Sequence, residues 1–404
     1  MAIYQGLVRV VSQYRNNLRL FSRNAWLFLL GTFFTGMGFS GFMLLFNLYL
    51  KSAGFPEGRI GNIITAGTLG TLIMAIPASA VIRRFSIKFI LILSIPIILI
   101  SRIAQISTLN YQLIIYSGLI AGLVSVFSQV ASAPFFMRNS TAQERPYLFS
   151  MNFAFGLVAG ILGSMMGGFL PGIIEKAGLV PYLTYRYTMY IFGGLVLAAL
   201  LPYLMIKEEP TRGPVERLQV SSSWRIIMKL FLPNLVTGIG AGLSIPFLNL
   251  YFKEVFSAST GSIGIFYGLQ QLLMISGLLI APVLAEKIGK IKTVALSQLI
   301  SIPFLVIMGI THNLWLAVVA FLIRATMMNM AQPLFSNYAM ERVKHSEQPF
   351  TNALLVIAWT AGWGASASIG GLLIEHYSYG LPFFTTSLLY LISTILIFAF
   401  FKQE

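Results

Sequence analysis

One cationic side chain lies deep within an apolar stretch of the sequence. Arg324 falls about ten residues into the run Leu314 to Phe335, where an unpaired guanidinium costs at least about 3 kcal/mol in a membrane. Neither Asp nor Glu lies deep within any apolar run, so no fixed acidic partner is evident. Such a guanidinium can bind a carboxylate, phosphate or sulfate, or a carbonyl-rich neutral molecule. The alternative is a structural Arg324 that is satisfied by helix-end carbonyls, amides such as Gln129 or Gln332, and water.

Amide, hydroxyl and aromatic side chains on other apolar runs could complete such a site. Asn329 and Gln332 share one stripe of a helix, with Arg324 about 80° around the helix from Gln332. Trp359 and Trp363 are one helical turn apart, so they form either an aromatic wall or an interhelical contact. Hydroxyls in membrane helices more often bond to backbone than to a ligand. The candidate substrate-binding residues are Arg324, Gln332, Asn329, Gln129, Asn47, Asn249, Ser125, Gln270, Trp359 and Trp363.

The sequence lacks the residues that several kinds of chemistry require. Cysteine is absent, and no His-rich cluster, paired carboxylates or Ser/His/Asp arrangement can be assembled at membrane depth. We therefore expect neither an enzyme nor a metal site, and no cofactor. A buried acid that could carry a proton is missing too. If the chain moves a solute, that movement could depend on Arg324 and the charge of the solute, on an end-lying acid such as Glu254, or on no ion at all; coupling to a proton or sodium gradient stays open.

The composition places most of the chain in lipid. Hydrophobic residues make up 57% of the 404 residues and charged residues only 10%, which is more apolar surface than a soluble core can bury. The formal charge of +15 is spread over short connectors, unlike the clustered basic face of a nucleic-acid-binding protein. We expect a multi-pass monomer in a bacterial or archaeal cytoplasmic membrane, with a small-molecule substrate and the lipid bilayer as its partners.

Apolar runs also define the fold class. Twelve runs are each near the roughly 20 residues that a helix needs to cross the hydrocarbon, which predicts an all-α protein of twelve transmembrane helices. Most Lys and Arg fall in connectors on the side of both termini, which predicts that both termini are cytoplasmic. The expected divisions are a cytoplasmic interfacial amphipathic segment at 1–24, a six-helix bundle at 25–206, a cytoplasmic linker at 207–224 and a second six-helix bundle at 225–404.

The two predicted bundles carry short matching sequences. Asn47 to Lys51 recurs as Asn249 to Lys253, at an offset of 202 residues. Glu144 and Pro146 recur as Glu347 and Pro349, and Gly167-Gly168 recurs as Gly370-Gly371, all at an offset of 203. Three matches in the same order indicate a duplicated unit. In a membrane protein, duplication of this kind is typical of a transporter whose substrate site lies between the two halves.

Twelve helices in two halves, with a polar linker and both ends inside, resemble the major facilitator superfamily. That family carries a Gly-x-x-x-Asp-Arg-x-Gly-Arg-Arg type of motif after helix 2 and a related one after helix 8. The second copy here keeps Glu286, Lys287, Gly289 and Lys290, whereas the first copy keeps only bases, among them Arg83 and Arg84. The resemblance implies that the acid takes part in a cytoplasmic charge network. Such a lock is therefore expected at Glu286 in the second half.

Glycines in the fifth run extend this resemblance. Gly163-Ser164-Met165-Met166-Gly167-Gly168 looks like the Gly-Pro-x-x-Gly-Gly motif of drug and metabolite exporters of the family. Physically, the glycines leave a groove along one helix face that allows close helix packing. The resemblance implies a secondary transporter that works by alternating access, and we predict an exporter of a small amphipathic or anionic organic solute. The alternatives are a facilitator or symporter for uptake of a metabolite or sugar, and a lipid or lysolipid flippase.

Overall fold

A computed structural model describes residues 18–141, 143–207, 223–344 and 347–401. Twelve of its helical segments are long and apolar enough to cross a membrane, which confirms the predicted all-helical fold. Most of the predicted interfacial segment at 1–24 and of the linker at 207–224 lies outside the described residues. Within the described part of the chain, every regular element is a helix.

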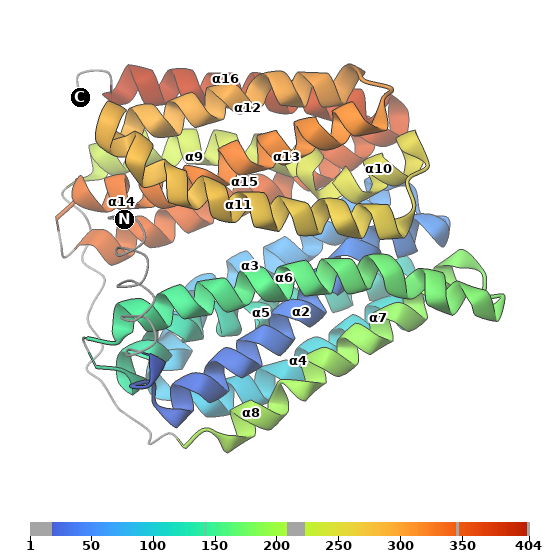
Figure 1. Ribbon diagram of the computed structural model, residues 1–404, viewed down its shortest axis with the longest axis horizontal. Coiled ribbons are helices and arrows are strands. Elements are labelled where there is room, and N and C mark those ends of the chain that lie inside the picture. The colour runs from blue at the N-terminus through green and yellow to red at the C-terminus, as the bar shows by residue number, and fades with distance from the viewer. Residues whose placement is uncertain (1–17, 142, 208–222, 345–346, 402–404) are drawn as a thin grey trace, which may run out of the picture.

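The two halves form two helical bundles, drawn in Figure 1 with the first half below and the second above. The first half contains α2 (Arg23–Ser52), α3 (Glu57–Arg84), α4 (Ile87–Ser107), α5 (Tyr111–Asn139), α6 (Arg145–Ile174), η1 (Glu175–Ala177), α7 (Pro181–Ala198) and α8 (Leu200–Met205). The second half contains α9 (Trp224–Ser244), η2 (Ile245–Phe247), α10 (Leu248–Phe256), α11 (Thr260–Ile288), α12 (Lys290–Ile310), α13 (Leu314–Met330), α14 (Gln332–Glu341), α15 (Gln348–His376) and α16 (Gly380–Phe401).

Local sequence sets where the helices begin and where they break. Asn110 caps α5 by accepting the amide N–H of Leu113, and Asn313 caps α13 by accepting that of Leu316. Three spans are divided, at α7/α8, at α9/η2/α10 and at α13/α14. Pro246 lies within η2 and cannot donate a helical hydrogen bond, which accounts for the break in the seventh span.

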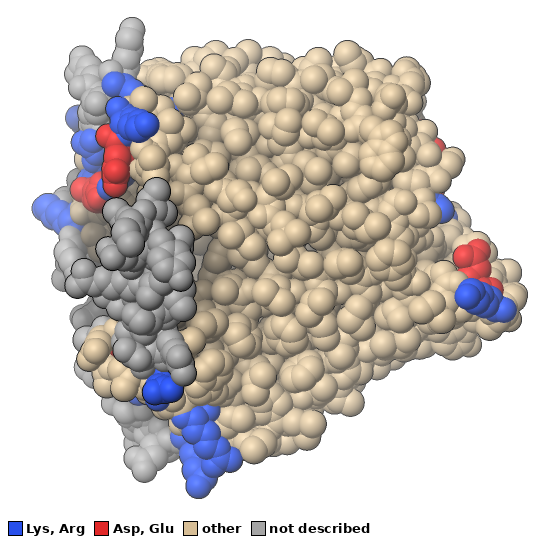
Figure 2. Space-filling model, in the orientation of Figure 1, with Lys and Arg blue, Asp and Glu red and all other residues tan. Residues whose placement is uncertain are grey.

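Charge identifies the two ends of the bundles. Lys and Arg gather at the end where α2 begins and α16 ends, while the broad middle of the visible face is free of charge (Figure 2). Because cytoplasmic connectors are enriched in Lys and Arg, this end is the cytoplasmic one. The described chain therefore enters and leaves on the cytoplasmic side, as predicted from the sequence.

The duplicated glycine pairs explain how the outer ends pack. Gly167 of α6 lies against α2 and Gly370 of α15 lies against α9, each within its own half. Gly168 and Gly371 instead face the other half, where they contact α11 and α3. A Cβ on Gly371 would lie 2.2 Å from the carbonyl oxygen of Glu57, so no larger residue fits there. Both seams between the halves are thus closed on the outer side by direct backbone contact.

Candidate functional site

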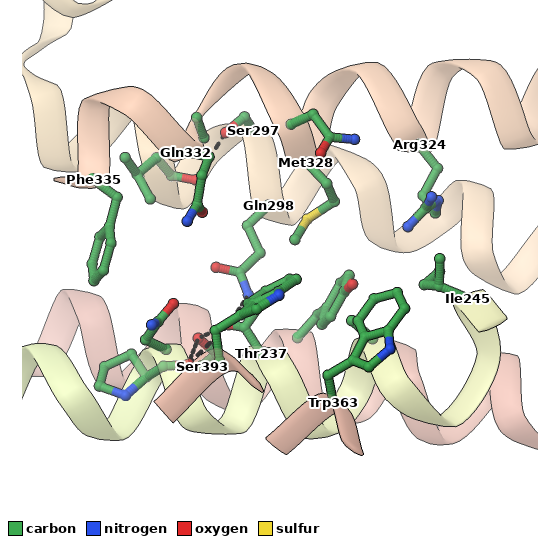
Figure 3. A pocket seen from close by; sticks show the side chains of 18 of the residues that line it. Thr237, Ile245, Ser297, Gln298, Arg324, Met328, Gln332, Phe335, Trp363 and Ser393 are labelled. Carbon is green, nitrogen blue, oxygen red and sulfur yellow. Dashed lines mark hydrogen bonds between the residues drawn. The ribbon is translucent and has the colours of Figure 1, made fainter. Parts of the chain in front are cut away.

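A cavity of about 400 Å³ lies within the second half of the protein (Figure 3). Its walls come from the spans α9 to α16, and no described residue of the first half lines it. Arg324 and Trp363 lie near one end, and Phe335 lies at the other (Figure 3). Because α13 runs from the outer side towards the cytoplasm and α14 continues it, Arg324 marks the outer end of the cavity.

Arg324 is the charged group of this cavity. Its side chain is buried at 5% exposure, and its Nε atom has no hydrogen-bond partner. The guanidinium lies close enough to the phenols of Tyr267 and Tyr390 to interact with both. Among the described residues, no Asp or Glu lines the cavity. An anionic ligand group placed here would fill the open donor positions of the guanidinium and neutralise its charge.

An aromatic wall lies beside Arg324. The indole rings of Trp359 and Trp363 project from one face of α15, with their ring centroids 6.0 Å apart and a 33° angle between the ring planes. Both side chains are half-buried and both line the cavity, so their apolar faces are available to a ligand. Flat aromatic or hydrocarbon groups are the ligand parts that such a wall binds.

A polar cluster lies between Arg324 and the cytoplasmic end. Gln298 Nε2 donates to Thr237 Oγ1 at 3.1 Å, and the hydroxyls of Thr237 and Ser393 are 2.7 Å apart. Thr237 and Ser393 can each donate to the carbonyl oxygen of Pro233, at 2.9 and 3.0 Å. The cluster joins α9, α12 and α16, which keeps the Gln298 side chain in a fixed position on the cavity wall (Figure 3).

The structure brings six of the predicted binding residues to this cavity. They are Arg324, Asn329, Gln332, Gln270, Trp359 and Trp363. Gln129 and Ser125, on α5 of the first half, do not line it; Gln129 is exposed and the Ser125 hydroxyl donates to the carbonyl oxygen of Gly122. The sequence led us to expect a site between the halves, whereas the described lining of this cavity comes from the second half alone.

Sequence reasoning missed several lining residues, and three of them lie beside Arg324 or in the polar cluster. Tyr267, Gln298 and Tyr390 come from α11, α12 and α16, and only α11 among these had contributed a candidate. The signal that could have found Tyr267 and Tyr390 is the cost of leaving Arg324 unpaired, since a buried guanidinium without a carboxylate needs neutral acceptors nearby.

Asn47 and Asn249 lie outside the cavity lining and join the two halves near their outer ends. Asn47 Nδ2 donates to the carbonyl oxygen of Pro246 at 2.7 Å, and Asn249 Nδ2 donates to that of Leu44 at 2.8 Å. Leu44 and Pro246 are themselves 202 residues apart, so the two bonds are related by the duplication. We call this pair of residues, Asn47 and Asn249, the asparagine clamp. It is buried, and it closes the outer side of the protein.

A second polar link closes the outer side at the start of α3. Glu57 accepts from Lys51 Nζ at 2.7 Å within the first half and from the Tyr379 hydroxyl at 3.1 Å in the second. A second bond crosses the seam in the opposite direction, since Glu375 of α15 accepts the backbone N–H of Gly58 at 2.9 Å. Burial and then the negative charge of Glu57 raise the pKa of Tyr379, so its hydroxyl keeps the proton that it donates.

The cytoplasmic motif of the second half forms a different pair from the expected one. Lys290 donates to Asn337 Oδ1 at 2.6 Å and pairs with Glu341 at the end of α14. Glu286 and Lys287 are exposed at the end of α11, and Gly289 has a φ of +91°, a conformation that favours glycine. In the first half Arg84 is exposed, and the side chain of Arg83 lies outside the described part.

Comparison with known proteins supports the fold described above. A model of the Major Facilitator Superfamily matches residues 28–237 and 230–404. The multidrug resistance protein MdtG of Dickeya zeae (strain Ech586) is 25% identical over 375 residues, which cover 86% of this chain and 89% of that protein.

Solved structures show the same architecture at low sequence identity. The nucleoside transporter NupG matches with a TM-score of 0.76 at 13% identity, covering 95% of this chain and 100% of NupG. A bacterial homologue of the human lysosomal transporter Spinster, in an inward-facing and unoccupied conformation, matches with a TM-score of 0.75 at 15% identity, covering 94% and 97%. The family model spans both halves, and the chain therefore belongs to the Major Facilitator Superfamily of secondary transporters.

Proposed function

We propose that this protein exports amphipathic organic anions, with Arg324 as the anchor for the anionic group. The observation that carries the proposal is the buried Nε atom of Arg324, which has no partner and lies at the end of a cavity whose described lining residues include no carboxylate. Trp359 and Trp363 supply an apolar surface beside this cation. A ligand that combines a negative charge with an aromatic or hydrocarbon body matches both features.

Alternating access would carry such a ligand across the membrane. The asparagine clamp and the glycine seams hold the outer side shut, so rocking the halves apart at these contacts would open the cavity outwards. Export is favoured by the similarity to MdtG, which is named a multidrug resistance protein, and by the exporter-like glycines at Gly163, Gly167 and Gly168.

The anchor can be tested with two ligands that differ mainly in charge. Naphthalene-2-sulfonate is an anion at neutral pH, and naphthalene-2-sulfonamide is its neutral counterpart. We expect the sulfonate to raise the melting temperature of the purified protein, and Arg324→Gln to weaken sulfonate binding at least about tenfold, because charge-assisted hydrogen bonds are lost. Binding of the sulfonamide should change much less.

The matched control is Arg59→Gln, which removes an exposed arginine that stacks on Tyr111 at the outer end of α3. This variant should bind the sulfonate like the wild type. Equal sulfonate binding by the wild type and Arg324→Gln contradicts the anchor. Flux assays in vesicles of known orientation then test direction, and inward movement alone would favour uptake of a metabolite or sugar instead of export.

A further inference from the structure

The cavity holds a positive charge that no acidic side chain among its described lining residues neutralises. Arg324 is the only formally charged side chain among the described residues that line it. Tyr267 and Tyr390 supply phenols, which offer hydrogen bonds but no negative charge at neutral pH. The sequence contains no Asp, and every Glu among the described residues lies outside the cavity lining. The site can therefore become neutral only when it binds an anion.

This imbalance matters most when the transporter changes state. Alternating access requires an intermediate in which the cavity is closed on both sides. The contacts on the outer side form or break only while the cytoplasmic side of the cavity is closed. The little water that still reaches the guanidinium through the cavity, at 5% exposure of the side chain, is then removed. An isolated charge without water or a counter-ion is strongly disfavoured, whereas an ion pair is not. The empty protein thus meets a barrier that the anion-loaded protein avoids.

The surroundings of Arg324 offer its guanidinium neither water on the outer side nor an acidic partner. It is buried at 5% exposure between α11 and α16, with its Nε atom enclosed and unpaired. The seam glycines and the asparagine clamp lie nearer the outer surface, so the guanidinium cannot reach water on that side while they are closed. In the described part of the lining, no acidic residue is present to pair with it.

We infer that this protein is an exchanger of organic anions, in which the anion-loaded form crosses between states readily and the empty form does so slowly. One anion leaves the cell as another enters, and the guanidinium is paired in each crossing. The inference rests on the proposed function, since it needs an anion at Arg324. It goes further by assigning the driving force to a counter-gradient of anions instead of a proton carried by a buried acid.

Exchange can be measured with the full-length protein in liposomes that are loaded with radiolabelled naphthalene-2-sulfonate. This sulfonate stays charged at all relevant pH values, so it leaks slowly through lipid. Efflux is followed into medium with no sulfonate and into medium that contains unlabelled sulfonate. We expect efflux to be at least about tenfold faster with sulfonate outside. Equal efflux into the two media overturns the exchange mechanism.

A variant separates this inference from the proposed function. In Arg324→Gln the empty cavity is neutral, so we expect the remaining protein-dependent efflux of naphthalene-2-sulfonate to be independent of sulfonate on the far side. Stimulation of that flux by far-side ligand, to the extent seen for the wild type with sulfonate, also overturns the mechanism. Failure of wild-type protein to bind sulfonate through Arg324 refutes the proposed function itself. Binding through Arg324 without stimulated efflux refutes exchange alone.

Discussion

The two halves are alike at their outer contacts and different at their centres. Tyr49 donates its hydroxyl to the carbonyl oxygen of Ile106, and Tyr251 donates to that of Met308, so donors and acceptors are both 202 residues apart. The asparagine clamp and the glycine pairs repeat in the same way. Duplication has thus kept the bonds that hold spans together and that close the outer side.

The central residues have diverged between the halves. Arg324 is eleven residues beyond the cap Asn313, and the position eleven residues beyond the matching cap Asn110 is Ala121, which is fully buried. At the offset of 203 that relates the glycine pairs, Trp359 and Trp363 correspond to Gly156 and Gly160. The charge and the aromatic wall therefore belong to one half only. Our proposal therefore places ligand binding in the second half, on a scaffold that both halves share.

The largest expected effect tests the shared seams. Gly168→Ala and Gly371→Ala should each destabilise the outward-closed state by about 1–3 kcal/mol, because the added Cβ meets backbone atoms of the other half. Since the protein has no cysteine, Ser368→Cys at the seam provides a unique labelling site. Both glycine variants should raise its reaction with an impermeant maleimide applied from outside. Gly172→Ala, which has nothing within 4 Å of its Cβ, is the control and should not.

The asparagine clamp should contribute nearly as much as the seams. Asn249→Ala leaves the carbonyl oxygen of Leu44 without this donor, and Asn47→Ala does the same to Pro246. We expect each change to shift the equilibrium towards the outward-open state by about 1–2 kcal/mol, and the two effects to be non-additive because the amides contact each other. The same labelling assay measures the shift. Effects that differ widely between the two variants would mean that the clamp is not symmetric.

A smaller effect is expected from the aromatic wall. Trp363→Ala should weaken binding of naphthalene-2-sulfonate and of naphthalene-2-sulfonamide by about fivefold each, because ring stacking does not depend on ligand charge. Calorimetric titration of both ligands would check this. The matching position in the first half, Gly160, does not line the cavity, so Gly160→Ala should leave both affinities unchanged. Loss of sulfonate binding alone would instead place Trp363 in the anion site.

The smallest expected effect is the difference in stability lost when either of two equivalent tyrosine hydrogen bonds is removed. Tyr49→Phe and Tyr251→Phe each remove one buried hydroxyl that donates to a carbonyl oxygen within its own half. We expect each to lower the free energy of unfolding by about 1 kcal/mol, with a difference below about 0.5 kcal/mol. Neither should change labelling at Ser368→Cys, since both bonds lie inside a half. Unequal losses in denaturation experiments would argue against a shared scaffold.

Much of the fold could be predicted from the sequence because lipid imposes strong constraints. Runs of apolar residues can only be helices there, and connector charges set their direction. The breaks at Ser244 and Ala331 were not predicted, because a proline in a membrane span can either kink a helix or divide it, and local sequence does not decide between them.

The candidate site was predicted less completely. Arg324 was evident because burying a cation is costly anywhere in a bundle. The roles of Asn47 and Asn249 were not, since their partners are backbone carbonyls of the other half, which every residue possesses. Likewise Gln298 gave no signal, because its hydrogen bond to Thr237 joins α12 to α9 and depends on tertiary packing.

The interruption at η2 has a mechanical consequence. It separates α10, a rod of nine residues, from the longer α9 that forms part of the cavity wall. Asn249 lies on the rod, whereas Thr237 of the polar cluster lies on α9. With a joint at η2, α10 can move away from the first half when the asparagine clamp breaks, while α9 keeps its contacts with its neighbours. The outer side can then open without a change in the shape of the cavity.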